Sequence, residues 1–116
     1  MTNSTAYSLP GRMIPKSNFN HVLFRVIKDS YNLEYTALIE RTRKRHVVLI
    51  RQAAMYMLRK HKHTTFEDIG RLMKLNHCTV LYSCNQCDES VKHGYDQQLK
   101  EVVNTLEFQL RLNGAI

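Results

Sequence analysis

Apolar residues recur every three or four positions along most of the chain, which is the spacing of an amphipathic helix. These stripes predict five or six helices joined by short polar breaks, at about residues 19–28, 33–40, 41–63, 66–73, 76–87 and 99–110. No internal repeat interrupts the pattern. The sequence therefore predicts an all-α protein, a compact bundle of about five to six helices.

The sharpest helix boundaries fall in the middle of the chain. Two overlapping Thr-to-acid spacings, 64–67 and 65–68, each fit a capping box, in which side chains satisfy the free backbone amides at a helix start. They predict a helix from near Phe66 to near Met73, with Gly70 leaving room for another helix to approach closely.

A second short helix is predicted directly after a turn at Lys74 and Leu75, because Asn76 is a good helix N-cap. On a helical wheel its apolar back contains Val80, Leu81, Cys84 and Cys87. Its front carries small hydrogen-bonding side chains, namely Cys78, Thr79, Tyr82, Ser83 and Gln86. Such a front suits the reading of base edges in a major groove, so residues 65–88 predict a helix-turn-helix with a recognition helix at 76–87. The same spacing also occurs in ordinary helical hairpins.

Composition and charge favour a polyanionic partner. The chain has 116 residues and 43% apolar content, which fits one globular domain, and its formal net charge is +7 with a pI near 9.5. Nucleic acid is the first expected partner and an anionic membrane surface the second. No apolar run is long enough to span a membrane and no signal-peptide pattern follows Met1, so a cytoplasmic, nucleoid-associated protein is expected.

The positive charge is concentrated in residues 41–63, which contain no Asp or Glu. We expect a long helix with one buried face and a basic rim, whose like charges cost roughly 0.2–0.5 kcal/mol per neighbouring pair. A solvated basic face is the commonest explanation of such a run, but an anionic partner would relieve the repulsion. Acidic residues collect toward the C-terminus instead, so the last helix should lie away from DNA.

The expected domain limits follow from the N-terminal composition. Residues 1–18 hold both prolines and show no sustained periodicity, which predicts a flexible N-terminal arm. Its Arg12 and Lys16 could lie along DNA, but two charges in such a segment are more often simply solvated. A single helical domain is expected over residues 19–113.

Metal and cysteine chemistry are the competing interpretations. Cys84 and Cys87 form a Cys-x-x-Cys pair, yet both are expected on the apolar back of their helix and no second pair occurs. Buried free thiols are the better interpretation, so no metal and no cofactor are predicted. His77 and Cys78 are neighbours that should point about 100° apart on a helix, which does not suit a base and its nucleophile. We therefore predict no enzymatic activity.

Three pieces of the sequence carry a family resemblance. They are RKRHVVLIRQAAMYMLR from Arg43, DIGRLM from Asp68 and HCTVLYSC from His77. With their order and spacing, the string from Arg43 to about Leu106 resembles the C-terminal DNA-binding domain of the bacterial replication initiator DnaA. The resemblance implies a helix-turn-helix domain similar to the DnaA C-terminal and Trp-repressor-like folds, and binding to double-stranded DNA.

The resemblance also implies roles for individual residues. Arg51 falls where the family places an arginine in the minor groove, and His77 and Thr79 fall on positions that read thymine-rich base pairs. Lys44 and Arg45 fall on a basic loop near phosphate. Together with the helical wheel and the charge pattern, base contacts are expected from Arg51, Asn76, His77, Cys78, Thr79 and Tyr82, and phosphate contacts from Arg43, Lys44, Arg45, Arg59, Lys74, Ser83 and Gln86.

Departures from the family pattern bear on specificity. The family turn usually carries Gly-Gly-Arg-Asp before the His, whereas the turn here is one residue shorter and lacks Gly. Asn76 stands where Asp is expected, and Cys78 where Thr is expected. Asp accepts a hydrogen bond from cytosine while Asn can pair with adenine, a difference worth about 1–3 kcal/mol, so the preferred DNA sequence can differ from the standard initiator box.

The expected function follows from the DNA-binding domain alone. No GxxxxGKS or GxxxxGKT phosphate loop occurs in the sequence, so neither ATP hydrolysis nor nucleotide binding is expected. The leading hypothesis is a sequence-specific regulator of replication or transcription at initiator-type sites, or an accessory factor of a phage or mobile element. The alternative is a module of the same fold that binds a replication or phage protein instead of DNA.

Overall fold

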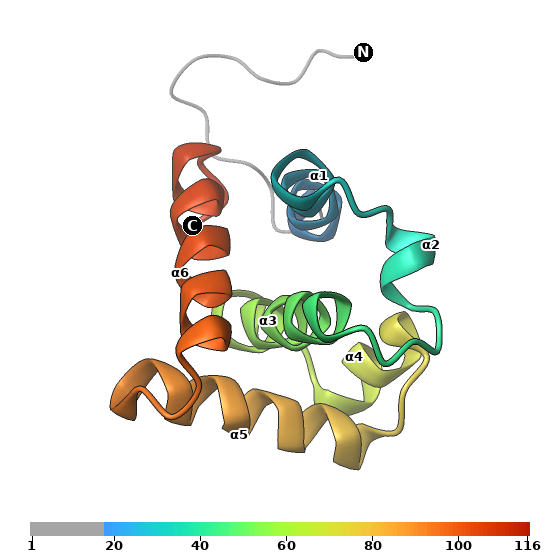
Figure 1. The fold of residues 1–116 in the computed structure, drawn as a ribbon. Coiled ribbons are helices and arrows are strands. Elements are labelled where there is room, and N and C mark those ends of the chain that lie inside the picture. The colour runs from blue at the N-terminus through green and yellow to red at the C-terminus, as the bar shows by residue number, and fades with distance from the viewer. Residues whose placement is uncertain (1–17) are drawn as a thin grey trace.

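The structure is a computed structural model that describes residues 18–116. This part of the chain contains six helices. In chain order they are α1 (Phe19–Tyr31), α2 (Tyr35–Leu38), α3 (Arg45–Lys62), α4 (Phe66–Met73), α5 (His77–His93) and α6 (Gln97–Leu112). No strand occurs within this range, and Figure 1 shows the helices gathered into one bundle, which confirms the all-α prediction. The expected flexible arm falls outside the described residues, apart from Asn18, which precedes α1.

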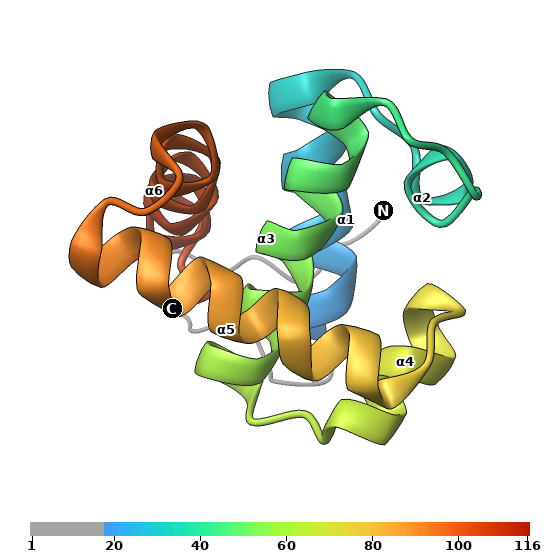
Figure 2. The same cartoon turned by 60° about the horizontal axis from the view of Figure 1, so that its bottom comes forward.

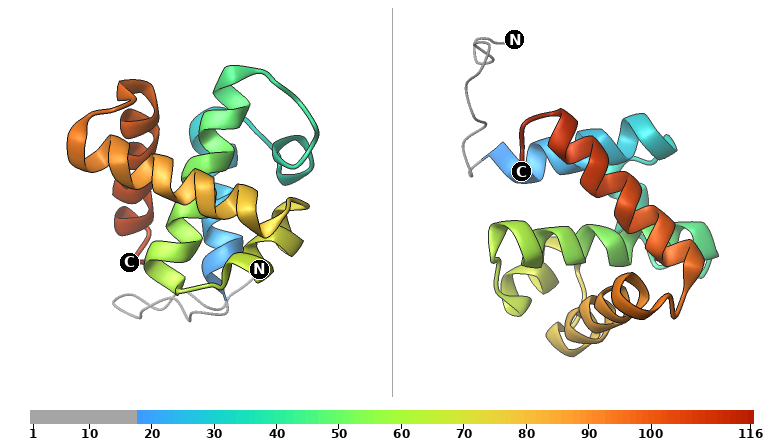
Figure 3. Two further views of the ribbon diagram at one scale, coloured as in Figure 1. Left: turned by 90° about the horizontal axis from the view of Figure 1, so that it is seen from below. Right: turned by 90° about the vertical axis from the view of Figure 1, so that its left-hand side faces the viewer.

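The third helix, α3, forms the centre of the bundle. It lies between α1 and α5 in Figure 1, α5 crosses over it in Figure 2, and the same order is visible from the side in Figure 3. It also packs against α6. Ala53, Ala54, Met57 and Leu58 of α3 are fully buried. The two alanines let neighbouring helices approach closely, and each large side chain contributes roughly 1.5–3 kcal/mol by leaving water.

The boundaries of α2 and α3 differ from those that the apolar periodicity predicts. α3 begins at Arg45 rather than near residue 41, because residues 40–46 offer no apolar side chain to bury, and residues 41–44 form a loop. α2 is only four residues long. Asn32 ends α1 in the left-handed conformation with a φ of 55°.

The fifth helix is longer than expected. It runs to His93 instead of ending near residue 87. The buried face of the helix continues past Cys87 to Ser90, which is fully buried. Gly94, in the left-handed conformation with a φ of 68°, then ends the helix as glycine commonly does.

The buried arc of α5 also differs from the helical-wheel prediction. Leu81, expected on the apolar back, is 42% exposed, and Ser83, expected on the polar front, is only 3% exposed. Successive residues turn by about 100°, and the arc that faces the bundle is centred near Cys87, which brings Ser83 inside and leaves Leu81 outside. The prediction was wrong for these two side chains because α5 is too mixed in polarity to fix its own orientation.

An acid on α6 and the acid that caps its N-terminus neutralise part of the positive charge of α3. Glu107 Oε2 lies 2.6 Å from Lys60 Nζ and 2.8 Å from His61 Nε2. At the other end of α3, Arg45 Nη2 lies 2.8 Å from Asp96 Oδ2. The expected repulsion along α3 is therefore partly relieved within the chain, by acids that lie far away in the sequence.

The carboxylate of Glu107 is stabilised in its charged form. Burial disfavours the charge, but the hydrogen bonds and charges of Lys60 and His61 outweigh this effect. The pKa of Glu107 consequently lies below its ordinary value. Its ionisation is thus coupled to the packing of α6 on α3.

Replacing Glu107 with Gln should destabilise the fold by about 1 kcal/mol at neutral pH, because it removes a partly buried carboxylate that pairs with Lys60 and lies within hydrogen-bonding distance of His61. Since the pKa of Glu107 is lowered by folding, its contribution is complete above the unfolded pKa and is lost as the pH falls through the folded pKa. Urea unfolding of both proteins across acidic to neutral pH measures the difference. The exposed Glu101→Gln on α6 is the control, and a difference that persists unchanged into strong acid would contradict the assignment.

Candidate nucleic-acid interface

The α4 and α5 helices form a tight helix-turn-helix. The Thr65 side chain caps α4 by accepting a hydrogen bond from the Asp68 amide at 3.1 Å, and the Leu75 amide donates to Gly70 O at 2.8 Å to close the turn. A Cβ on Gly70 would lie 2.5 Å from Leu75 O, so the turn requires glycine there. The predicted limits of α4 are confirmed, and of the two capping spacings the one at 65–68 is used.

The start of α5 brings the predicted base-contacting residues of this helix together. The Asn76 side chain accepts a hydrogen bond from the Cys78 amide at 2.7 Å, which confirms the predicted N-cap. His77, Cys78, Thr79 and Tyr82 are all exposed on the first turns. They form one surface at the N-terminal end of the helix.

This surface carries no negative charge. No acidic residue occurs between Asp68 and Asp88, and the acids of α5, Asp88 and Glu89, come later in the helix. A helix that enters a groove by its N-terminal end brings only its early residues close to DNA. The acids of α5 therefore lie outside the part that would approach a polyanion.

The cap restricts how Asn76 can contact a base. Pairing with adenine through two hydrogen bonds uses both the oxygen and the nitrogen of the amide. The Oδ1 atom of Asn76 already accepts the Cys78 amide, so it would have to serve the cap and the base together. The Nδ2 group is a donor in either case.

His77 and Cys78 lie closer together than expected. His77 Nε2 is 3.7 Å from Cys78 Sγ, because the imidazole is long enough to bridge two neighbouring positions. The prediction that they point apart was wrong in this respect. Within residues 18–116 no third side chain is hydrogen-bonded to the His77 ring to orient it, as nucleophilic pairs require.

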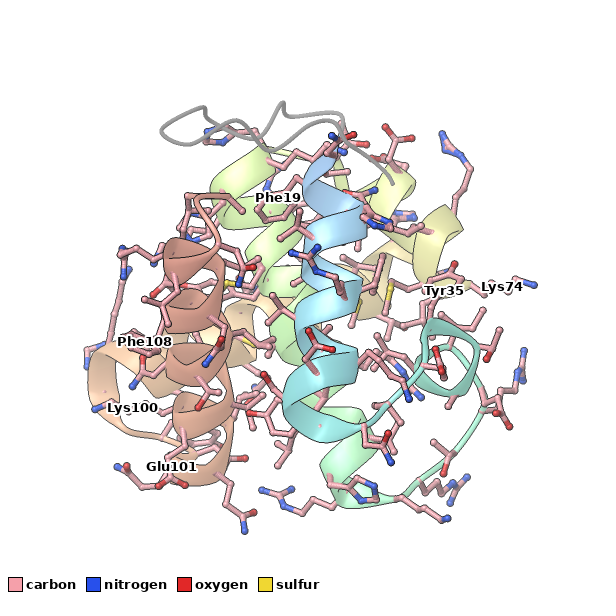
Figure 4. The ribbon with its side chains drawn as sticks, turned by 90° about the horizontal axis from the view of Figure 1, so that it is seen from above. Phe19, Tyr35, Lys74, Lys100, Glu101 and Phe108 are labelled. Carbon is pink, nitrogen blue, oxygen red and sulfur yellow. The ribbon has the colours of Figure 1, made fainter. Side chains whose placement is uncertain are left out.

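Three of the predicted phosphate contacts are exposed cations. They are Arg43 and Lys44 in the 41–44 loop and Lys74 in the turn. Figure 2 shows α2, which leads into that loop, on the same side of the molecule as α4 and the first turns of α5. Figure 4 places Lys74 on the side opposite to Phe108 and other residues of α6.

The other predicted phosphate contacts are engaged or buried. Arg45 pairs with Asp96, so a phosphate would have to compete with a carboxylate. Arg59 donates to a backbone carbonyl at 3.1 Å and lies 4.3 Å from the centre of the Phe66 ring. Ser83 is buried, so its hydroxyl is not exposed to DNA and its predicted phosphate contact is corrected. Gln86 is half-buried.

Arg51 is also engaged within the chain. Its Nε donates to Leu38 O at 2.8 Å and its Nη2 donates to Glu40 O at 2.7 Å. Burial lowers the pKa of this guanidinium. The placement of Arg51 in a minor groove stays a prediction, and it would require both hydrogen bonds to be released.

The cysteines of α5 separate into one exposed and two buried thiols. Burial raises the pKa of Cys84 to about 11, and burial likewise raises the pKa of Cys87, whose Sγ donates to Gln52 O at 3.4 Å. Both are neutral packing residues. Across residues 18–116 no group of three or more His, Cys, Asp or Glu side chains is arranged to hold a metal ion, and none of the described helices is long and apolar enough to cross a membrane.

The amino-acid sequence matches the family described as "Bacterial dnaA protein helix-turn-helix" over residues 21–87. The chain belongs to this family. It is 32% identical over 91 residues to the chromosomal replication initiator protein DnaA of Chloroflexus aurantiacus. The aligned residues cover 78% of this chain and 19% of that protein. It is also 34% identical over 89 residues to DnaA of Flavobacterium psychrophilum, and these residues cover 76% of this chain and 18% of that protein. No solved structure matches it.

Membership of the DnaA helix-turn-helix family confirms the resemblance and supports DNA binding. The matched range runs from α1 into the second half of α5, so it contains both the 41–44 loop and the turn. The chain spans about a fifth of the length of the DnaA proteins it matches.

The turn of this DnaA-type helix-turn-helix holds a strained lysine. Lys74 adopts the left-handed conformation, with a φ of 57°. Glycine takes this conformation without cost, whereas another residue there loses about 1 kcal/mol. The turn therefore keeps an exposed cation between its two helices at the expense of stability.

Replacing Lys74 with Gly should raise the free energy of unfolding by roughly 0.5–1 kcal/mol, while Lys74→Ala should leave it unchanged or lower it. Both substitutions remove the same charge, so their effects on duplex affinity should be equal. Urea unfolding and duplex titration of the two variants separate the backbone effect from the charge effect. Equal stabilities would contradict the strain at Lys74.

Proposed function

We propose that this chain binds double-stranded DNA in a sequence-specific manner through its helix-turn-helix. One observation carries the proposal: the exposed, acid-free start of α5 lies on the same side of the molecule as the exposed cation of the turn, Lys74. In this arrangement α5 enters the major groove by its N-terminal end. Lys74 and the cations of the 41–44 loop then meet phosphates and fix the register of the helix.

Base reading is assigned to the first turns of α5. His77 and Thr79 supply hydrogen-bonding groups, and Tyr82 extends the contact surface by one turn. Cys78 offers a small apolar thiol that can contact a thymine methyl group where the family has Thr. Asn76 contributes its amide nitrogen as a donor beside the cap. These differences favour a site related to the initiator box but not identical with it.

A regulatory role in replication or transcription is the biological function that we propose for this binding. The matched relatives are named chromosomal replication initiator proteins, and the shared part is their helix-turn-helix region. A protein with this domain can occupy initiator-type sites in the nucleoid and thereby change their access to other factors.

A protein-interaction module is the second candidate function. Phe108 and Leu112 are 57% and 65% exposed on α6, one turn apart. Large apolar side chains that neighbour one another on a surface favour contact with another protein, such as a replication or phage protein. This surface is on the side away from Lys74, so the two functions involve different residues.

Duplex binding should weaken as salt rises, with log affinity falling against log salt by roughly 0.9 for each phosphate contact. The Arg43→Gln variant should lower that slope by about one contact, because it removes an exposed cation from the 41–44 loop. Fluorescence titrations of a duplex at several salt concentrations measure the slope.

The matched control is Arg111→Gln, which removes the same charge from an exposed position on α6 and should leave the slope unchanged. A flat salt response, or no duplex binding at low salt, would reject the DNA-binding proposal and favour the protein-interaction module.

A further inference from the structure

The outer face of α6 is left uncovered by the other described helices. The inner face of this helix packs on α1, α3 and α5 through buried side chains such as Leu106. The outer face is a stripe whose exposed side chains include Glu101, Thr105, Phe108, Arg111 and Leu112. Figure 4 shows Glu101 and Phe108 on α6 at the margin of the molecule. Two large apolar side chains, Phe108 and Leu112, are therefore in contact with water on a face that is otherwise polar.

The exposed side chains repeat with the spacing of a seam between two helices. Glu101, Thr105, Phe108 and Leu112 follow one another at intervals of four, three and four residues, as the core positions of a coiled coil do. A second α6 in parallel orientation would place like charges together at Glu101 and again at Arg111. An antiparallel orientation instead places the end of one helix that carries Arg111 beside the end of the other that carries Glu101. Charge therefore favours the antiparallel orientation.

The antiparallel orientation matches the face with itself. If the two-fold axis passes between Thr105 and Phe108, Phe108 of each copy lies against Thr105 of the other. The same axis brings Arg111 opposite the residue that follows Glu101, within reach of its carboxylate. The two Phe108 side chains are then offset by about 4.5 Å along the helix axis, a distance at which aromatic rings pair. One symmetry operation thus forms two ion pairs and an apolar centre.

The two charges of this face have no partner among the described residues. Glu101 and Arg111 are exposed, and neither side chain forms an ion pair with another residue of 18–116. They cannot pair with each other within one chain, because the intervening helix separates them by about 15 Å. Both are therefore in position to meet a second copy.

The charge around the face also favours a second copy over a polyanion. Residues 96–112 contain three acids and two bases, whereas residues 41–63 contain bases and no acid. A chain with a net charge of +7 repels its copies over most of its surface, and this repulsion is smallest where the acids collect. A face that binds an anionic membrane or DNA would need a basic rim instead.

We propose that the outer face of α6 is a self-complementary surface on which two copies of the chain pair in antiparallel orientation, with Phe108 at the centre and Glu101 paired with Arg111 on both sides. The proposal does not rest on DNA binding. It leaves the helix-turn-helix free, because Lys74 lies on the opposite side of the molecule from Phe108.

The size of the face sets the strength of the pairing. One face of a single helix is smaller than the area of about 800 Å² per partner that stable complexes bury. The dimer should therefore dissociate with a constant on the order of 10–100 µM, so that the chain is a monomer at the nanomolar concentrations of a duplex titration.

Sedimentation equilibrium of the full chain, from about 5 to 500 µM and without DNA, measures the pairing. The average mass should rise with concentration from 13.6 kDa toward twice this value. Phe108→Ala should weaken the association roughly tenfold or more, because it removes the apolar centre. The control is Tyr95→Ala, which removes an even more exposed aromatic side chain just before α6 and should leave the association unchanged.

Exchange of the two charges identifies the partner as a second copy. Glu101→Arg and Arg111→Glu should each weaken self-association roughly tenfold, because each variant places like charges together at both sides of its own dimer. An equimolar mixture of the two variants should associate as strongly as the wild type, because each contact in the mixed pair again joins opposite charges. Native mass spectrometry should show the mixed dimer. Glu67→Arg and Arg71→Glu make the same changes at exposed positions on α4 and should each self-associate like the wild type.

The outcomes separate a second copy from other occupants of the face. A wild type that stays monomeric over the whole concentration range would overturn the proposal and leave the face to a different protein. A dimer that persists in Phe108→Ala would place the contact elsewhere, and a mixture that associates no better than its two components would exclude the antiparallel pairing. Far-UV circular dichroism checks that each variant keeps its helices, and recovery of association in the mixture cannot come from misfolded chains.

Discussion

Burial of α3 at the centre of the bundle is the constraint on which the rest of the structure depends. Its apolar side chains, among them Ala54, Met57 and Leu58, are enclosed by the other helices. Its cations therefore lie at the edges of the buried face, where Glu107 of α6 and the N-cap residue Asp96 pair with some of them. Packing and charge pairing act together, because the same contact that covers α3 neutralises part of it.

The charge that remains unpaired has consequences for function. The acid-free segment 41–63 suggested a basic helix face as the contact with DNA. In the structure Arg45, Arg51, Arg59, Lys60 and His61 are hydrogen-bonded within the chain. The side chains of Arg43, Lys44 and Lys74 are exposed and form no hydrogen bond with residues 18–116. The phosphate-contacting part of the proposed interface thus comes from connecting segments held by the bundle, and loops positioned by a rigid scaffold commonly carry function.

Local signals made much of the fold predictable from sequence. The caps at Thr65 and Asn76 are local chemistry, and they located the two helices of the helix-turn-helix. The orientation of α5 was less predictable, because Ser83 and Leu81 exchange places according to how α5 packs on its neighbours. The engagement of Arg51 was not predictable at all, since its acceptors are backbone carbonyls, which every residue possesses.

The central claim is that the start of α5 reads DNA sequence. The most direct test compares the affinity for a duplex selected from a random pool with the affinity for random duplex, in the wild type and in His77→Ala. If His77 reads a base, the substitution should lower the ratio of the two affinities by roughly 5- to 150-fold, the equivalent of about 1–3 kcal/mol, and leave random binding nearly unchanged. Equal losses on both duplexes, or a wild-type ratio near one, would contradict the claim.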